Sequence, residues 1–203
     1  TVLVGLTAAP TTAAAQELQA PRPRQGYYVT LGTHGTVERT SEEGDALELS
    51  NGWTTTIRLG QLISNRRGLG LGLLFDFGTA SGSDQQQSSM TGIGLAAQVE
   101  VAANLALHGA VGFAVLTIDD RREQDDPLRG TYGAAYTVGL TYDWFFTNRQ
   151  RSGGWAVTPT LFVRWLPGDN ISSVAGFLGL ELSYWTGLPK NQLSLPDAQA
   201  YSR

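Results

Sequence analysis

From residue 27 onward, bulky apolar residues alternate with small or polar ones at a period of two. Successive side chains of a β-strand point to opposite faces of the sheet, so this period predicts strands. No segment shows the 3.6-residue apolar repeat of a helix. The predicted strands are eight runs: 26–35, 52–62, 68–78, 91–102, 105–118, 131–146, 155–166 and 174–186. The chain is therefore predicted to be all-β.

The two faces of these strands differ in size and charge. One face is bulky and uncharged, as in Leu69, Leu71, Leu73, Phe75 and Phe77. The other face holds Gly, Ala, Thr and isolated charges, which suit the narrow lumen of an eight-stranded barrel better than a water-facing surface. The bulky face is therefore expected to contact lipid, where one Arg or Lys at mid-depth would cost about 2–4 kcal/mol. The alternative is a soluble, lipocalin-like barrel with the bulky face inside.

Composition narrows the classes of protein further. Only 16% of the 203 residues are charged, against an average of about 25%. Gly occurs 25 times, well above its average share of about 7%. The net charge of -4 argues against a nucleic-acid partner. The absence of Cys excludes disulfides, Cys-based zinc sites and thiol nucleophiles. We expect neither a metal nor a cofactor.

The ends of the chain are read as targeting and linking segments. Residues 1–15 are interpreted as an N-truncated signal peptide, because an apolar start leads to Ala13, Ala14 and Ala15, a small-x-small cleavage pattern. Residues 16–25 form a polar lead, 26–186 the barrel and 187–203 a periplasmic tail. This signal peptide predicts that the protein is exported from a bacterial cytoplasm.

Loop lengths and aromatic positions agree with a membrane barrel. Long external loops are predicted at 36–51, 79–90 and 119–130, opposite shorter periplasmic turns. Aromatic residues near the strand ends predict two interfacial belts. The periplasmic belt would contain Tyr27, Tyr28, Trp144, Phe145, Phe146, Trp155, Tyr184 and Trp185, and the outer belt Trp53, Phe75, Phe77, Tyr132 and Trp165. Pro159 lies inside a predicted strand and is expected to break its ladder or cause a bulge.

Over residues 26–186 the chain resembles the small eight-stranded outer-membrane barrels of the OmpA/OmpX type. The resemblance is architectural and includes no family-specific motif, so it assigns no functional residue. It implies a closed antiparallel barrel of meander topology, porin-like in build, in the outer membrane of a Gram-negative bacterium. The partners it implies are outer-membrane lipid and lipopolysaccharide, and we expect a monomer.

A set of polar and ionisable side chains falls on the small-residue face and is predicted to line the lumen. The set is His34, Arg58, Asp76, Gln98, Glu100, His108, Asp143, Arg164 and Glu181. Charges in a narrow lumen must be paired or hydrated, so we predict internal ion pairs that plug the barrel. A polar path for water or small ions is the alternative. A tight turn at 102–104 would place Gln98 opposite His108.

The predicted role is structural or interactive at the cell surface, with a surface ligand contacting the external loops. One alternative is a narrow channel for small solutes. Another is a lipid A-modifying enzyme, which would need a nucleophile, a base and an orienting acid together. Neither His34 nor His108 has such partners nearby in the sequence, so we expect no enzymatic activity.

Overall fold

The computed structural model describes residues 26–42, 45–64, 68–82, 86–102, 104–120, 128–146 and 153–187. The predicted signal peptide, the polar lead and the tail from residue 188 lie outside these ranges. In the described ranges no helix has the length and apolar character needed to cross a membrane.

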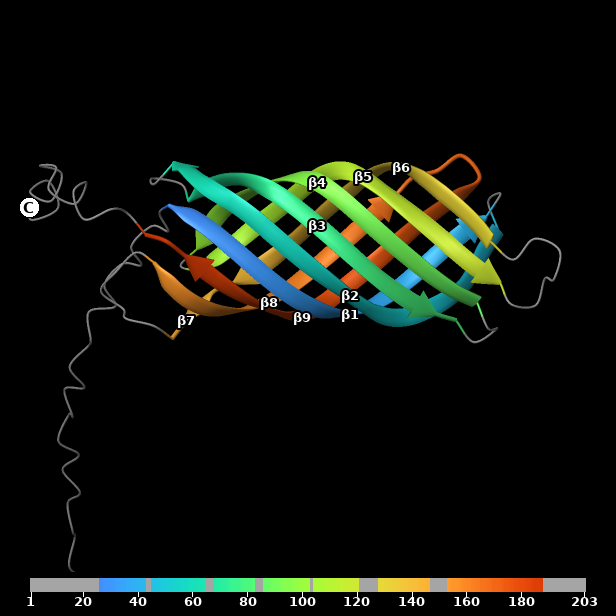
Figure 1. Ribbon diagram of the computed structural model, residues 1–203, viewed down its shortest axis with the longest axis horizontal. Helices are drawn as coiled ribbons and strands as arrows, with labels where there is room; N and C mark the ends of the chain where they lie inside the picture. Colours follow the sequence, from blue (N-terminus) through green and yellow to red (C-terminus); the bar gives the residue numbers. More distant parts are fainter. Residues whose placement is uncertain are drawn as a thin grey trace, which may run out of the picture.

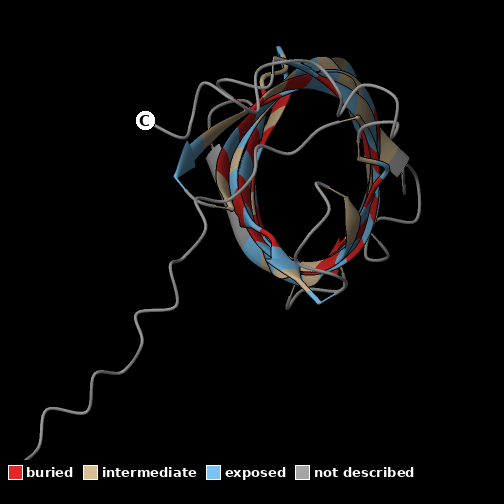
Figure 2. Ribbon diagram, turned by 90° about the vertical axis from the view of Figure 1, so that its left-hand side faces the viewer, coloured by how far each residue is buried: buried red, intermediate tan, exposed pale blue. Residues whose placement is uncertain are grey.

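The strands form one closed barrel (Figures 1 and 2). They are β1 (Tyr27–Glu42), β2 (Asp45–Ser64), β3 (Leu69–Ser81), β4 (Gln86–Ala102), β5 (Leu105–Asp120), β6 (Leu128–Tyr142), β7 (Trp144–Phe145), β8 (Gly154–Leu166) and β9 (Ile171–Trp185). All described pairings are antiparallel and join sequential neighbours, β1 to β9 and β6 to β8. The two-residue β7 continues β6 beyond Asp143, so the barrel has eight strands. The predicted closed, eight-stranded meander is confirmed.

The stagger of the barrel follows from the strand register. Starting at Tyr28 and moving from each residue to its partner on the next strand, the path returns to β1 at Glu38, ten residues further on. A stagger of this size requires strands that tilt strongly against the barrel axis, and it brings residues far apart in the sequence to one height in the lumen.

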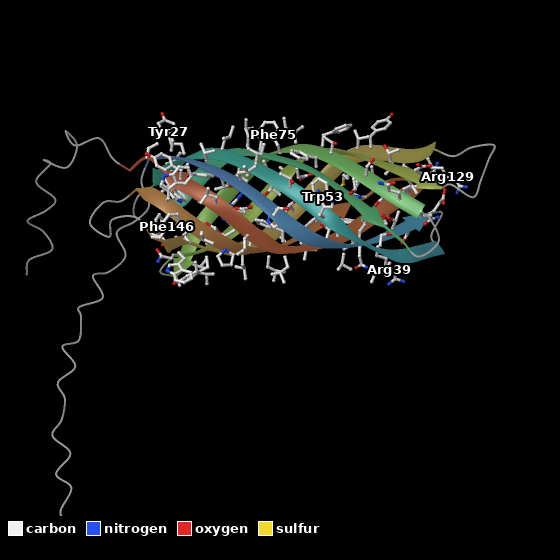
Figure 3. The ribbon with its side chains drawn as sticks, turned by 60° about the horizontal axis from the view of Figure 1, so that its bottom comes forward. Tyr27, Arg39, Trp53, Phe75, Arg129 and Phe146 are labelled. Atoms are coloured by element: carbon white, nitrogen blue, oxygen red, sulfur yellow. The ribbon has the colours of Figure 1, made fainter. Side chains whose placement is uncertain are left out.

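The orientation of the two faces is confirmed by burial. Leu71 and Leu95 on the bulky face are 51% and 67% exposed, whereas Gly70 and Asp143 are buried. Figure 3 shows Tyr27 and Phe75 on the outside of the wall, and Trp53 is 51% exposed. The soluble reading is wrong, because it required this apolar face to form a core. So wide a band of exposed aliphatic and aromatic side chains fits contact with lipid.

The described parts of the long outer loops predicted from the sequence are mostly strand. β1 and β2 remain paired as far as Glu42 and Asp45, inside the predicted loop 36–51. The described ends of the loops predicted at 79–90 and 119–130 likewise belong mostly to β3, β4, β5 and β6, and residues 83–85 and 121–127 lie outside the described ranges. In these extensions polar side chains such as Arg39, Asn51 and Ser89 are exposed, although Val37 and Leu49 are exposed there too. The regular apolar alternation therefore becomes sparse here, while the ladder continues.

Pro159 breaks the ladder as predicted. β6 pairs with β8 as far as Thr141 and Thr160, and the pairing resumes in the same register between Trp144 and Val157. Proline has no N–H to donate to the opposite strand, so the pairing fails beside it without a bulge.

Candidate functional site: the filled lumen

The lumen is filled in layers, and aromatic residues close the end nearest the termini. Tyr28, Leu62 and Trp185 are buried in one cluster, with the Tyr28 and Trp185 ring centroids 4.8 Å apart. The prediction that Tyr28 and Trp185 belong to the periplasmic aromatic belt is wrong, because both side chains are buried. The two-residue period turns both side chains inward, each beside an outward aromatic neighbour, Tyr27 and Tyr184.

Glu181 on β9 is the centre of the polar layer above this cluster. The Arg58 Nη2 group of β2 donates to Glu181 Oε2, and the Thr56 hydroxyl donates to Oε1 at 3.0 Å. His34 Nε2 lies 3.6 Å from the same Oε1. All four side chains are buried, so the carboxylate is neutralised by direct contacts and not by bulk water.

His108 extends the polar layer to the opposite wall. Arg58 Nη1 lies 2.8 Å from His108 Nδ1, and His108 Nε2 lies 2.8 Å from Thr141 Oγ1. Arg58 Nη1 also lies 3.1 Å from Nε2, so the imidazole is held between the guanidinium and the Thr141 hydroxyl. Gln98 pairs with His108 across β4 and β5, so the predicted register is confirmed.

A second ion pair, Arg164 with Asp76, lies closer to the outer end. Arg164 Nη1 donates to Asp76 Oδ1 at 2.8 Å across the lumen, from β8 to β3. The guanidinium carbon lies 4.6 Å from the ring centroid of Phe177. Arg58 makes a similar but longer contact of 5.6 Å with Phe162. Each cation thus has a carboxylate and an aromatic face as partners.

Glu38 is a lumen residue that the sequence analysis missed. It is buried, and it accepts hydrogen bonds from Ser88 and Ser173, both at 2.6 Å. It also lines a small pocket together with Arg164. Glu38 lies in a segment interpreted as a loop, and only its even-numbered alternation with Thr36 and Thr40 could have marked it as inward.

An apolar cluster fills the outer part of the lumen. Its members are Met90, Ala114, Leu116, Ile118, Ala135, Leu166 and Ile171. Leu116 and Leu166 are almost completely buried. The lumen thus holds ion pairs at its centre and an apolar cluster towards each end, with buried polar groups such as Glu38 and Asp143 beside those clusters.

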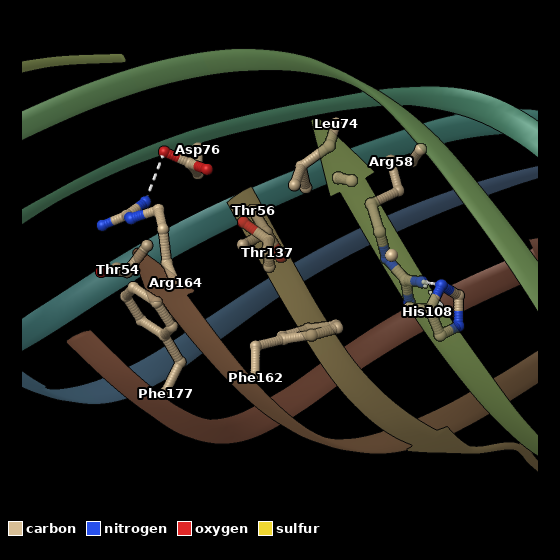
Figure 4. Close-up of a pocket in the computed structure, with 13 residues that line it drawn as sticks. Thr54, Thr56, Arg58, Leu74, Asp76, His108, Thr137, Phe162, Arg164 and Phe177 are labelled. Atoms are coloured by element: carbon tan, nitrogen blue, oxygen red, sulfur yellow. Dashed lines mark hydrogen bonds and ion pairs between the residues drawn. The ribbon is translucent and has the colours of Figure 1, made fainter. Parts of the chain in front are cut away.

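A cavity lies between the two ion pairs (Figure 4). It is small, and its lining includes Arg58, Arg164, Phe162 and Phe177 together with Leu74 and several Thr and Ala residues. Arg58 Nε has no hydrogen-bond partner among the described residues. The space thus lies between the two cations, with aromatic and small side chains completing its lining.

The remaining predicted lumen residues lie near the terminus end. Asp143 is buried and accepts a hydrogen bond from Thr158 Oγ1 at 2.7 Å. The Ser183 hydroxyl lies 2.8 Å from Thr158 Oγ1. Glu100 is only half-buried and accepts from the Asn104 N–H in the β4–β5 turn. Glu100 therefore lies apart from the central network.

No described arrangement matches a hydrolytic relay or a metal centre. His34 Nδ1 donates to the main-chain oxygen of Thr54 at 3.3 Å, and both Thr160 Oγ1 and Glu181 lie on the Nε2 side. A relay needs the acid on one ring nitrogen and the nucleophile on the other. Among the described residues, no group of three His, Cys, Asp or Glu side chains could hold a metal ion.

Comparison with known proteins gives matches in structure only. No family model matches the chain, and no curated protein matches its sequence. The attachment invasion locus protein Ail of Yersinia pestis is similar in structure, with a TM-score of 0.52 and 13% identity over 78% of this chain and 99% of Ail. Neisserial surface protein A gives 0.49 and 12% identity, over 79% of this chain and 97% of its own. OprG of Pseudomonas aeruginosa gives 0.44 and 11% identity, over 82% of this chain and all of OprG.

At such low identity the likeness concerns the fold alone. Ail is matched over nearly its whole length, so the barrel is shared as a unit. The closed meander, the exposed apolar band and this match lead to one conclusion: the chain has the fold of the small eight-stranded outer-membrane barrels.

Proposed function

We propose that this protein is a closed, non-conducting barrel of a Gram-negative outer membrane that presents its extended strands at the cell surface. The observation that carries the proposal is the filled lumen. Two guanidinium–carboxylate pairs cross its centre, and an apolar cluster occupies each end. Ions and small solutes would have to break both the ionic and the apolar layers to pass.

The strand extensions support a role outside the membrane. β1 and β2 continue outward beyond the height of Trp53 on β2. The outer ends of β3 to β6 likewise continue beyond the height of Phe77 on β3. A barrel that only filled space in the lipid would not need these paired extensions. In this proposal both termini face the periplasm, and lipid and lipopolysaccharide contact the outer wall of a monomeric barrel.

Planar-bilayer recording tests whether the lumen conducts. Purified protein should give no discrete conductance steps, whereas a porin of about sixteen strands reconstituted in the same way gives large ones. Reproducible single-channel steps that scale with protein concentration would overturn the closed-barrel proposal. They would favour a narrow channel, for which the central cavity is the supporting observation.

Single-cysteine labelling tests the orientation, because the chain contains no Cys. Ser89→Cys lies in an outer extension and should react with a membrane-impermeant maleimide on intact cells. Gln61→Cys, exposed near the terminus end, is the matched control and should react only after the outer membrane is permeabilised. The reverse pattern would place the extensions in the periplasm and refute the surface role.

A further inference from the structure

The central cavity exists because three small side chains lie in a row along its wall. Ala96 of β4 pairs with Ala110 of β5, and Ala110 pairs with Thr137 of β6. Thr137 in turn pairs with Arg164 of β8, and all four residues line the cavity. Because partners on neighbouring strands lie side by side, this row leaves a space beside the Arg164 side chain.

Arg58 brings an unsatisfied donor to this cavity. Its Nη1 group contacts His108 and its Nη2 group donates to Glu181. Its Nε group is buried and has no hydrogen-bond partner in the described part of the chain. A buried donor without an acceptor is costly, and an ion or a water molecule is a usual reason for one. An acceptor inside the cavity would satisfy this group.

Arg164 and Thr137 add further donors. Arg164 is buried, and of the residues that the structure describes only Asp76 accepts a hydrogen bond from it, at Nη1. Its Nε and Nη2 groups have no described acceptor, and neither does the Thr137 hydroxyl. Figure 4 shows Thr137 between Arg164 and Arg58, beside the same cavity. Unsatisfied donors therefore come from both arginines and from the wall between them.

Aromatic rings hold both guanidinium groups in place. The guanidinium carbon of Arg164 lies 4.6 Å from the Phe177 ring centroid, and that of Arg58 lies 5.6 Å from the Phe162 centroid. Two histidine rings contact Phe162 edge-on, with centroid distances of 5.9 and 6.1 Å. Donors that are fixed in advance bind a ligand with little loss of conformational entropy.

The charges around the cavity favour an anion. The lining contains two arginines and one carboxylate, Asp76, so one positive charge is left over when His108 is neutral. Glu181 contacts Arg58 from outside the lining and is shared with a threonine and a histidine. Glu38 lines a neighbouring pocket and accepts hydrogen bonds from two serines. Neither of these two carboxylates reaches into the cavity.

We propose that one small monovalent anion, of the size of chloride, binds between Arg58 and Arg164 inside the lumen. Arg58 Nε, the unsatisfied N–H groups of Arg164 and the Thr137 hydroxyl are its donors. Water is a poorer occupant, because it brings two donors of its own and leaves the excess positive charge in place. The inference goes beyond the surface role: the anion joins the two ion pairs into one buried network.

Diffraction from bromide crystals tests the site directly. The protein is refolded and crystallised with sodium bromide in place of chloride, so that the anion can enter as the barrel closes. The anomalous signal of bromide should give one peak inside the cavity, in contact with both guanidinium groups. An empty cavity, or water density without an anomalous peak, would overturn the proposal.

Stability in chloride tests the same site in solution. The apparent unfolding temperature, measured in detergent at a fixed urea concentration, should rise with chloride concentration, because the anion binds only the folded barrel. Sodium gluconate at the same ionic strength should give no such rise, since its anion is too large for the cavity. Equal curves in the two salts would mean binding at crystal concentration only and would refute a resident anion.

Substitutions in the lining locate the effect. Thr137→Val removes one donor and should weaken chloride binding about tenfold. Ala96→Val fills the space and should abolish the response to chloride, with Ala110→Val as the second variant if Ala96→Val does not fold. Thr30→Val is the matched control, since it removes a buried hydroxyl outside the cavity and should keep the full response. Wild-type responses in the folded lining variants, or a lost response in Thr30→Val, would refute this position for the anion.

Discussion

The centre and the ends of the lumen are filled in two different ways. At the centre, Arg58, Glu181, His108 and Arg164 contact one another or Asp76 through directed polar contacts. At the ends, clusters around Trp185 and Leu116 fill the space by shape. Ionic groups require particular partners, whereas apolar clusters tolerate substitutions that conserve volume. The centre therefore fixes which strands face each other, and the ends exclude water.

The largest effect is expected from breaking the central pair on one side only. Glu181→Ala leaves Arg58 buried without its carboxylate and should lower the free energy of unfolding by about 3–5 kcal/mol. Urea unfolding in lipid vesicles, followed by tryptophan fluorescence, measures the change. The double variant Arg58→Leu, Glu181→Leu is the control and should recover most of the loss, since removing both charges leaves neither unpaired. A double variant as unstable as Glu181→Ala would show that shape, and not charge, governs the centre.

A charge on the outside of the wall should cost somewhat less. Leu95 lies on the exposed face of β4, paired with Leu73 and Val111 in the middle of the apolar band. Leu95→Arg should destabilise the barrel by about 2–4 kcal/mol in the same assay. Ser89→Arg, on the same strand but beyond the band, should change stability by about 1 kcal/mol or less. Similar losses at both positions would contradict the proposed depth of the lipid.

The apolar outer cluster should respond in small steps. Ile171 is buried between β1 and β8, and Ile171→Val removes one methylene group. Such deletions usually cost about 0.5–1.5 kcal/mol. A loss as large as that of Glu181→Ala would remove the distinction between directed and shape-filling layers. Heat-modifiable migration on detergent gels would verify that the variant still closes.

The sequence predicts which residues of this barrel face inward better than it predicts which of their side chains contact one another in the lumen. The period of two predicts the inward set, and the tight turn near Asn104 correctly places Gln98 opposite His108. Which charges meet across the lumen depends on the ten-residue stagger, which no local pattern encodes. Glu38 and the outer strands were missed for a different reason. Outside the lipid, a strand loses the apolar alternation by which it is recognised.

The smallest expected effect is a gain, and it concerns the β6–β8 seam. Tyr142 of β6 pairs with Leu105 of β5 but not with Pro159 of β8, while the β6–β8 register continues unchanged on both sides of this gap. Pro159→Val restores an N–H and a strand-forming side chain, so it should stabilise the barrel by about 0.5–1 kcal/mol. Pro159→Gly supplies the N–H but not the strand preference and should give less. If Pro159→Val destabilises the barrel, the gap is required by the inward path of Asp143 into its hydrogen bond with Thr158, and the lumen, not the ladder, sets the shape of this seam.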